Sequence, residues 1–427
     1  MYQDENIKKS SSRKKILIVA AIIIGLVLIG ALLIGIRNHQ KKNQNIGGPT
    51  VGPTDENKIN PSQESNNPLS SLPACKDGKE LFTTFPVKEG EYTSIVPLGN
   101  LNPSGHTFPT DHIYVEVHDP QHPQDYTVAV AKALIAPADI LIYGIQSSEQ
   151  VGGVVDYAID FSPCKDAKGK FGHVGSISAK LKTEIDKIET KCNEYETGGK
   201  KYRGCDYFGL KIEVKVGEQI GTAGSERSGM LDIWMSDYRE PQAKRANESR
   251  WNSDRNYVSC FLDYYSESQK NQFYGFLRGP DNGIRTKEPR CGTVEVDVAG
   301  TAQGVWFNNL EGQFQLEDTH LALAYDNIQT DKQIFSVGTA ASTVGIPTGA
   351  YSFTPKAEGQ ANRDFSQVTA DGKTYCYDTI NANNRGASKT MLLTMPSAEK
   401  LRIAILSGST CGAGPWQMNN SFVEYER

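Results

Sequence analysis

Histidine is scarce in this chain of 427 residues, and its clustering is the first feature that could carry chemistry. Five of the seven histidines lie between residues 106 and 173. Two of them, His106 and His112, share one short segment with the carboxylate of Asp111, and Pro109 could bend that segment around a single point. Imidazole and carboxylate groups together are typical ligands of Zn²⁺. The alternative is that these three groups only hydrogen-bond a turn.

The segments that follow along the chain occur in an informative order. They are an Ala-Pro-Ala-Asp sequence at 136–139, a strand-like run at 155–159, and motifs at 171–177, 214–224 and 230–234. In this order, residues 97–237, about a third of the chain, resemble the lysostaphin/LytM-type zinc metalloendopeptidases, which share the duplicated-hybrid-motif β-fold. Residues 171–177 are similar to that family's Y-x-H-L-S-x-I motif, and residues 214–224 are similar to its V-K-x-G-Q-x-I-G-x-x-G motif.

The resemblance implies a zinc site. In the family, a histidine and an aspartate of an H-x-x-x-D motif and the second histidine of an H-x-H motif hold the metal. His106 is similar to the first ligand and Asp111 to the second, but the spacing here is H-x-x-x-x-D, one residue longer. His112, which shares strand parity with His106, is the alternative to Asp111. Three protein ligands would leave a position open for an activated water.

The catalytic part of the resemblance is incomplete. His173 matches the histidine of the Y-x-H motif, which assists the water in the family, but the H-x-H motif has become Met230-Leu231-Asp232. Asp232 could still bind a metal, because carboxylates bind Zn²⁺ and also harder cations. Met230 cannot act as an acid or a base. The candidate site is therefore catalytic His173 with metal ligands His106, Asp111, His112 and Asp232.

Three functions are compatible with this pattern. The first hypothesis, which we favour, is a non-catalytic descendant that works as a binding or regulatory module of the cell envelope, with or without a bound metal. The alternative is a metal-dependent endopeptidase or hydrolase that acts on cell-envelope peptides or peptidoglycan through an altered site. The third hypothesis is a different activity, or a purely structural role, on the same β-scaffold. Zinc, or another divalent metal, is the cofactor that the resemblance implies.

The elements that must position these residues are mostly β-strands. From about residue 75, short β-like runs alternate with turn residues, as at 126–135, 140–145, 154–161 and 210–216. One helical stretch interrupts them: Ser178 could cap it, and Leu181, Ile185 and Ile188 recur at helical spacing. We therefore predict an all-β fold with a helical insertion in a LytM-like β-domain at 74–238.

A second β-domain follows a charged boundary at 239–255. We predict strands at 257–264, 293–298, 304–307, 320–325, 334–337, 390–394 and 401–406, punctuated by Gly and Pro. This pattern is typical of a β-sandwich or barrel-like domain at 256–427. The sequence indicates no role for this domain, and its lone histidine, His320, is interpreted as structural.

The N-terminal region predicts a membrane anchor. Residues 16–36 form an unbroken apolar run of 21 residues, which as a helix spans about 30 Å, the thickness of a bilayer core. Five basic residues precede the run and three follow it closely, which favours a cytoplasmic segment at 1–15 and extracytoplasmic domains on a single-pass anchor. Residues 37–73, rich in Asn, Pro, Ser, Gly and Gln, are expected to form a flexible tether.

The remaining composition fits this topology. The formal net charge is −5, but residues 1–42 carry +6, so the rest of the chain carries −11. We therefore expect no nucleic-acid partner, because nucleic-acid binders show a basic patch. All eight cysteines follow the anchor, as four disulfides in an oxidising compartment require. Local pairing predicts Cys192–Cys205, Cys260–Cys291 and Cys376–Cys411, with buried free thiols as the alternative.

Overall fold

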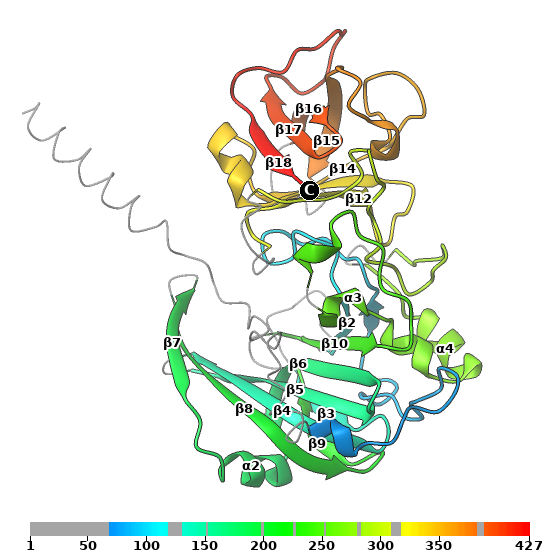
Figure 1. Ribbon diagram of the computed structural model, residues 1–427, viewed down its shortest axis with the longest axis vertical. Helices are drawn as coiled ribbons and strands as arrows, with labels where there is room; N and C mark the ends of the chain where they lie inside the picture. The colour runs from blue at the N-terminus through cyan, green and yellow to red at the C-terminus, as the bar shows by residue number, and fades with distance from the viewer. Residues whose placement is uncertain are drawn as a thin grey trace, which may run out of the picture. The chain divides into compact units, whose positions relative to one another are not determined.

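The computed structural model describes most of the chain after residue 67 (Figure 1). The described ranges are 68–117, 130–150, 153–197, 200–224, 228–251, 253–279, 283–308, 317–381 and 388–427. The predicted basic segment, the membrane helix at 16–36 and most of the tether lie outside these residues, as do His39, His118 and His122. Within the described ranges, the structure contains no helix of the length and apolar character needed to cross a membrane.

The first sheet has ten strands, and neighbouring strands such as β2 (His112–Glu116) and β10 (Met230–Asp237) pair antiparallel. Figure 1 shows the arrangement of this sheet. Eight follow one path, in the order β1 (Ser94–Val96), β2, β10, β6 (Ala167–Ile177), β5 (Val155–Cys164), β4 (Ile140–Gln150), β8 (Lys200–Val214) and β7 (Cys192–Thr197). Off this path, β9 (Gln219–Ala223) pairs with both β3 (Lys132–Ile135) and β6. The predicted β-rich class is confirmed.

One face of this sheet is apolar and packs into a core, as alternating strand side chains require. On β6, Phe171 and Val174 are fully buried, and a side chain at Gly169 would overlap the ring of Phe161 at 2.2 Å. The predicted helical insertion is confirmed as α2 (Ala179–Ile185), whose first turn is capped by the Ser178 hydroxyl. The opposite face of β6 is free to carry polar side chains.

The segment after β10 differs from the sequence prediction. The expected strand at 257–264 is replaced by a run of short helices, and no strand forms at 293–298. The helices are η4 (Glu248–Arg250), α3 (Ser253–Asn256), η5 (Phe261–Tyr264) and α4 (Glu267–Tyr274). The physical reason is aromatic packing: Phe261 and Tyr264 contact the ring of Phe82 in the first core. Aromatic residues favour strands only where the sheet context lets them pack.

The second sheet is an eight-stranded antiparallel meander in strict chain order. Its strands are β11 (Gly304–Trp306), β12 (Leu321–Tyr325), β13 (Gln333–Val337), β14 (Gly349–Phe353), β15 (Tyr375–Asn381), β16 (Lys389–Ser397), β17 (Lys400–Leu406) and β18 (Val423–Glu426). The bridge between Phe307 and Glu426 joins its two ends, so the sheet is close to a closed barrel. Aromatic side chains such as Trp306, Phe335 and Tyr377 fill its interior. Three 3-10 helices complete the described elements: η3 (Pro68–Ser71), η6 (Thr339–Val344) and η7 (Phe365–Gln367).

A separate apolar cluster links the outer face of the meander to the segment that precedes β2. Phe108 and Trp251 pack there against Phe307, and Ala322 and Ala350 complete the contact from β12 and β14. Phe108 follows the predicted site residue His106 by two positions. This packing therefore fixes the backbone that carries the candidate site.

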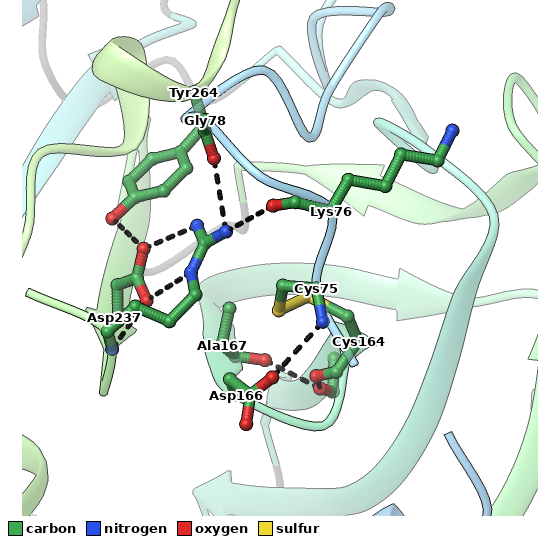
Figure 2. The surroundings of a disulfide bond; sticks show 10 residues. Cys75, Lys76, Gly78, Cys164, Asp166, Ala167, Asp237 and Tyr264 are labelled. Atoms are coloured by element: carbon green, nitrogen blue, oxygen red, sulfur yellow. Dashed lines mark hydrogen bonds and ion pairs between the residues drawn. A yellow bond between two sulfur atoms is a disulfide. The ribbon is translucent and has the colours of Figure 1, made fainter. Parts of the chain in front are cut away.

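All eight cysteines form disulfides. The three locally predicted pairs, Cys192–Cys205, Cys260–Cys291 and Cys376–Cys411, are confirmed. The fourth joins Cys75 to Cys164 across 89 residues of chain. The Cys75 amide also donates to the Asp166 carboxylate, and the two atoms are 3.1 Å apart. Figure 2 shows this contact beside the disulfide. The first described loop is thereby tied to the end of β5.

Candidate functional site

Three adjacent strands place the candidate residues on one face of the first sheet. In the pairing of β2 with β10, Trp234 lies opposite His112 and Asp232 lies opposite Tyr114. In the pairing of β10 with β6, Asp232 also lies opposite Gly172, which directly precedes His173. Directly opposed residues share a face of the sheet. The apolar core of this sheet therefore supports a cluster of imidazoles and carboxylates on its other side.

Five side chains form a continuous line of contacts: four lie on β2, β5, β6 and β10, and the fifth, Asp111, directly precedes β2. Asp232 lies at its centre: its Oδ2 is 3.7 Å from His112 Nε2 and 3.5 Å from His173 Nε2. Each histidine contacts a second carboxylate through its other nitrogen. Asp111 Oδ1 is 3.0 Å from His112 Nδ1, and Asp156 Oδ2 is 2.8 Å from His173 Nδ1. The order is carboxylate, imidazole, carboxylate, imidazole, carboxylate.

The centre of this line is buried, and two of its polar atoms have no hydrogen-bond partner in the described structure. The side chains of His112 and Asp232 are 2 % and 8 % exposed. Within the described ranges, His112 Nε2 and Asp232 Oδ1 make no hydrogen bond. Leaving buried polar atoms unpaired costs about 1–3 kcal/mol each, so such atoms indicate a missing ligand or a functional site.

Asp111 does not point into the centre of the site. It accepts hydrogen bonds from Trp234 Nε1 at 2.9 Å and pairs with Arg255 Nε at 3.3 Å, in addition to its contact with His112. Burial opposes ionisation of Asp111, but the Arg255 guanidinium and the hydrogen bonds from His112 and Trp234 outweigh it and hold the pKa of Asp111 well below its usual range. Both oxygens are therefore engaged, and Asp111 supports His112.

His106 lies at the rim, next to His112. The ring centroids of the two imidazoles are 5.3 Å apart in an edge-on arrangement. Burial, and then the neighbouring His112, lower the pKa of His106 to about 3. His106 is therefore an uncharged imidazole at neutral pH, as a metal ligand must be.

His173 has the least common backbone conformation in the site. Its φ is 56°, in the left-handed region that non-glycine residues seldom adopt, and such strain concentrates at functional sites. Its side chain is 36 % exposed, so His173 forms the open edge of the cluster. Gly172 beside it is required for space, because a Cβ there would lie 2.8 Å from the Trp234 ring.

Met230 completes the comparison with the sequence prediction. It begins β10, two residues before Asp232, and pairs in register with Glu116 of β2. A thioether cannot take or give a proton at neutral pH. The position that the resembled family uses for a catalytic histidine therefore supplies no acid or base here.

Several supporting residues were not identified from the sequence. Asp156, Trp234, Arg255 and Glu317 belong to this group. Glu317 is buried and accepts from the Phe108 amide at 3.1 Å, and one of its oxygens lies 3.3 Å from Arg255 Nη1. Burial raises the pKa of Glu317 to about 7, because one guanidinium between two buried carboxylates cannot fully neutralise both. Asp156 and Trp234 lie on the predicted or motif-bearing segments of β5 and β10, whereas Arg255 and Glu317 lie outside both strands and have no local sequence signal.

The donor chemistry of the cluster suits a divalent metal ion, although its side chains do not surround a single point. Among the described residues, no three His, Cys, Asp or Glu side chains already have the arrangement of a metal site. Ligands of tetrahedral zinc at 2.0–2.1 Å from the metal lie about 3.4 Å apart. The two distances from Asp232 to the imidazoles, 3.5 and 3.7 Å, are close to that separation. Each imidazole also has the supporting carboxylate that metal-bound histidines usually have.

Comparison of the chain with protein-family models, with curated proteins and with solved structures finds no match.

Proposed function

We propose that this chain is a membrane-anchored, extracytoplasmic protein of the cell envelope whose first sheet binds a divalent metal ion and serves in binding or regulation. The observation that carries the proposal is a pair of buried polar atoms at the centre of the site. His112 Nε2 and Asp232 Oδ1 are buried without a hydrogen-bond partner in the described structure. The Nε2 atom of His173 also faces Asp232, at 3.5 Å from its Oδ2.

Three residues would hold the ion: His112, His173 and Asp232. Two neutral imidazoles and one carboxylate are a donor set suited to Zn²⁺, and Asp232 also suits harder cations. A small movement of His173 would complete the set, because it is the most exposed of the three side chains. When bound, the ion would supply a Lewis-acidic point for a carboxylate or carbonyl of an envelope peptide. His106, uncharged at the rim, is available as a further ligand.

A binding role is favoured over hydrolysis because the acid–base groups are poorly suited to the task. Met230 replaces one of the two histidines that the resembled zinc endopeptidases use. His106 could not take over that role efficiently, because its pKa, at about 3, is far from the value near 7 that suits a general base. If His173 binds the metal, its lone pair is also unavailable to a water.

The resemblance to the lysostaphin/LytM-type endopeptidases supports the placement in the envelope, as do the predicted anchor and the disulfides. Four disulfides and no free cysteine among the eight are typical of an oxidising compartment. The predicted anchor at 16–36 and tether at 37–73 would hold the two β-rich parts outside the membrane. The partners we propose are the membrane, through that one helix, and an envelope peptide or peptidoglycan.

Hydrolysis of envelope peptides is the second candidate function. One observation favours it: His173 is backed by Asp156 at 2.8 Å and is 36 % exposed, which is how a general base is commonly held. In that case His173 would act on a water, and His112, Asp232 and His106 would hold the ion.

The proposal is tested with full-length protein purified in detergent. Bound Zn, Mn, Fe and Cu are measured, and Zn²⁺ is titrated calorimetrically into wild-type protein, Asp232→Asn and the control Asp139→Asn, whose exposed side chain pairs with Lys215. We expect one equivalent of metal in the wild type and in the control, and loss of binding in Asp232→Asn. Absence of binding to the wild type would contradict the proposal. Release of peptides from peptidoglycan, lost in His173→Ala, would favour the second candidate.

A further inference from the structure

Arg255 lies behind the site and joins two carboxylates that are far apart in the sequence. Its Nε is 3.3 Å from Asp111 Oδ2, and its Nη1 is 3.3 Å from Glu317 Oε1. Glu317 is itself held by the Phe108 amide at 3.1 Å. The guanidinium is therefore fixed from both sides, and a planar guanidinium is suited to such directed contacts.

The contacts of Asp111 determine which nitrogen of His112 carries the proton. Trp234 and Arg255 are donor-only side chains, so both oxygens of Asp111 must act as acceptors. The Oδ1 atom, which accepts from Trp234, is also the atom 3.0 Å from His112 Nδ1. His112 must then donate from Nδ1. In the uncharged imidazole this leaves the lone pair on Nε2, the atom that faces Asp232.

We infer that Arg255 is a positioning residue for His112. It holds Asp111 so that Asp111 orients the imidazole and selects its Nδ1–H form, and Glu317 holds Arg255 in turn. The effect on the protonated nitrogen does not depend on a bound metal. Only its consequence for metal affinity rests on the proposed function. Partners of this kind typically change metal affinity by about 10- to 100-fold.

The test is ¹⁵N spectroscopy of the full-length chain labelled at histidine only. Seven histidines give a spectrum simple enough to assign, with His112→Gln identifying the His112 signals. For the uncharged imidazole of wild-type His112, we expect the proton on Nδ1 and none on Nε2. In Arg255→Gln, we expect a mixture of the two forms, and Zn²⁺ affinity about 10- to 100-fold lower.

Arg239→Gln is the matched control. Arg239 pairs with the buried Asp237 at the end of β10, at 2.7 Å, and its side chain is exposed to nearly the same extent as that of Arg255, 24 % against 26 %. Its hydrogen bonds go to Asp237 and to the carbonyls of Lys76 and Gly78, so this variant should leave the His112 signals unchanged. If Arg255→Gln does not fold, Glu317→Gln takes its place, with a smaller change in the same direction.

The outcomes separate this inference from the proposed function. If His112 keeps a single Nδ1–H form in folded Arg255→Gln and in Glu317→Gln, Arg255 is not a positioning residue, whatever the metal content. If the His112 signals change as expected but the wild type binds no Zn²⁺, the positioning role stands and the proposed metal function fails.

Discussion

The Nε2 atom of His173 lies 3.5 Å from Oδ2 of Asp232, while its Nδ1 lies 2.8 Å from Asp156 Oδ2. A single imidazole thus connects the centre of the site to a supporting carboxylate on β5. The same arrangement is repeated on β2, where His112 connects Asp232 to Asp111. This repetition is the basis of the predictions below.

Removing the imidazole of His173 distinguishes a ligand from a general base. If His173 holds the ion, we expect His173→Ala to lower Zn²⁺ affinity by at least about 100-fold, because one of three ligands is lost. If His173 only moves protons, affinity stays near the wild-type value and any hydrolysis falls by about 10²–10⁴-fold. Calorimetric titration of the full-length chain measures the first quantity, and His39→Gln, in the predicted tether, serves as the histidine control.

The carboxylate behind His173 should matter almost as much as a ligand. We expect Asp156→Asn to weaken Zn²⁺ binding by about 10- to 100-fold, because the imidazole loses its charged acceptor. Asp160→Asn is the control, since Asp160 is on the same strand but pairs with Lys170 at 3.9 Å. Equal losses in both variants would show that the effect comes from the strand and not from the contact with His173.

The backbone of His173 predicts an unusual order of stability between two variants. At a φ of 56°, the backbone conformation of alanine is less favourable than that of glycine by about 1 kcal/mol, because the alanine Cβ makes steric clashes there. We therefore expect His173→Gly to be more stable than His173→Ala by about that amount, although glycine normally destabilises a strand. Denaturant unfolding of the two variants checks the sign, and both lack the imidazole, so its contacts cancel. Greater stability of the alanine variant would contradict the left-handed conformation.

Glu317 makes a testable contribution to the pH dependence of stability. Its pKa rises from 4.5 to about 7 on folding, so the folded state binds this proton more tightly than the unfolded state. The resulting stabilisation is fully present below pH 4.5 and is lost as the pH rises through 7, by about 3 kcal/mol. Glu317→Gln should remove this part of the decline, so that the stability difference between pH 4.5 and 7.5 shrinks. Glu399→Gln, at an exposed glutamate, is the control variant. An unchanged difference in Glu317→Gln would contradict the raised pKa.

The long disulfide should contribute more stability than the short one. Loop closure by Cys75–Cys164 spans 89 residues and by Cys192–Cys205 only 13, so the loop-entropy account gives the first about 1–2 kcal/mol more. Paired Cys→Ser variants of each bridge, unfolded by denaturant under non-reducing conditions, measure this difference. A larger loss from the short bridge would show that contacts in the native state, and not loop length, determine the effect.

Local patterns in the sequence predicted much of the fold. Alternation identified β3, β4, β5 and β8 of the first sheet and five of the eight strands of the second, and Ser178 with Leu181 and Ile185 identified α2. Proximity along the chain identified three disulfides, but Cys75–Cys164 could not be found this way because its partners are 89 residues apart. The prediction of a strand at 257–264 was wrong, because its aromatic side chains pack into a core formed with distant residues such as Phe82.

The site was predictable only in part for the same reason. The five predicted residues come together because β2, β10 and β6 are neighbours in the sheet, and the resemblance had implied that these residues share one site. The supporting groups come from elsewhere: Arg255 from α3, and Glu317 from the region before β12, 206 residues after Asp111 in the sequence. No local spacing connects them. Only the three-dimensional structure therefore shows that Asp111, expected to be a metal ligand, instead supports His112 as a hydrogen-bond acceptor.

X-ray absorption spectroscopy of the zinc-loaded, full-length protein tests the central claim most directly, because it reads the ligands of the ion. The account predicts a first shell of nitrogen and oxygen atoms at about 2.0–2.1 Å, with outer-shell scattering from two imidazoles that falls to one in His112→Gln and in His173→Ala. A spectrum without imidazole scattering, or one that neither substitution changes, would contradict a metal site formed by His112, His173 and Asp232.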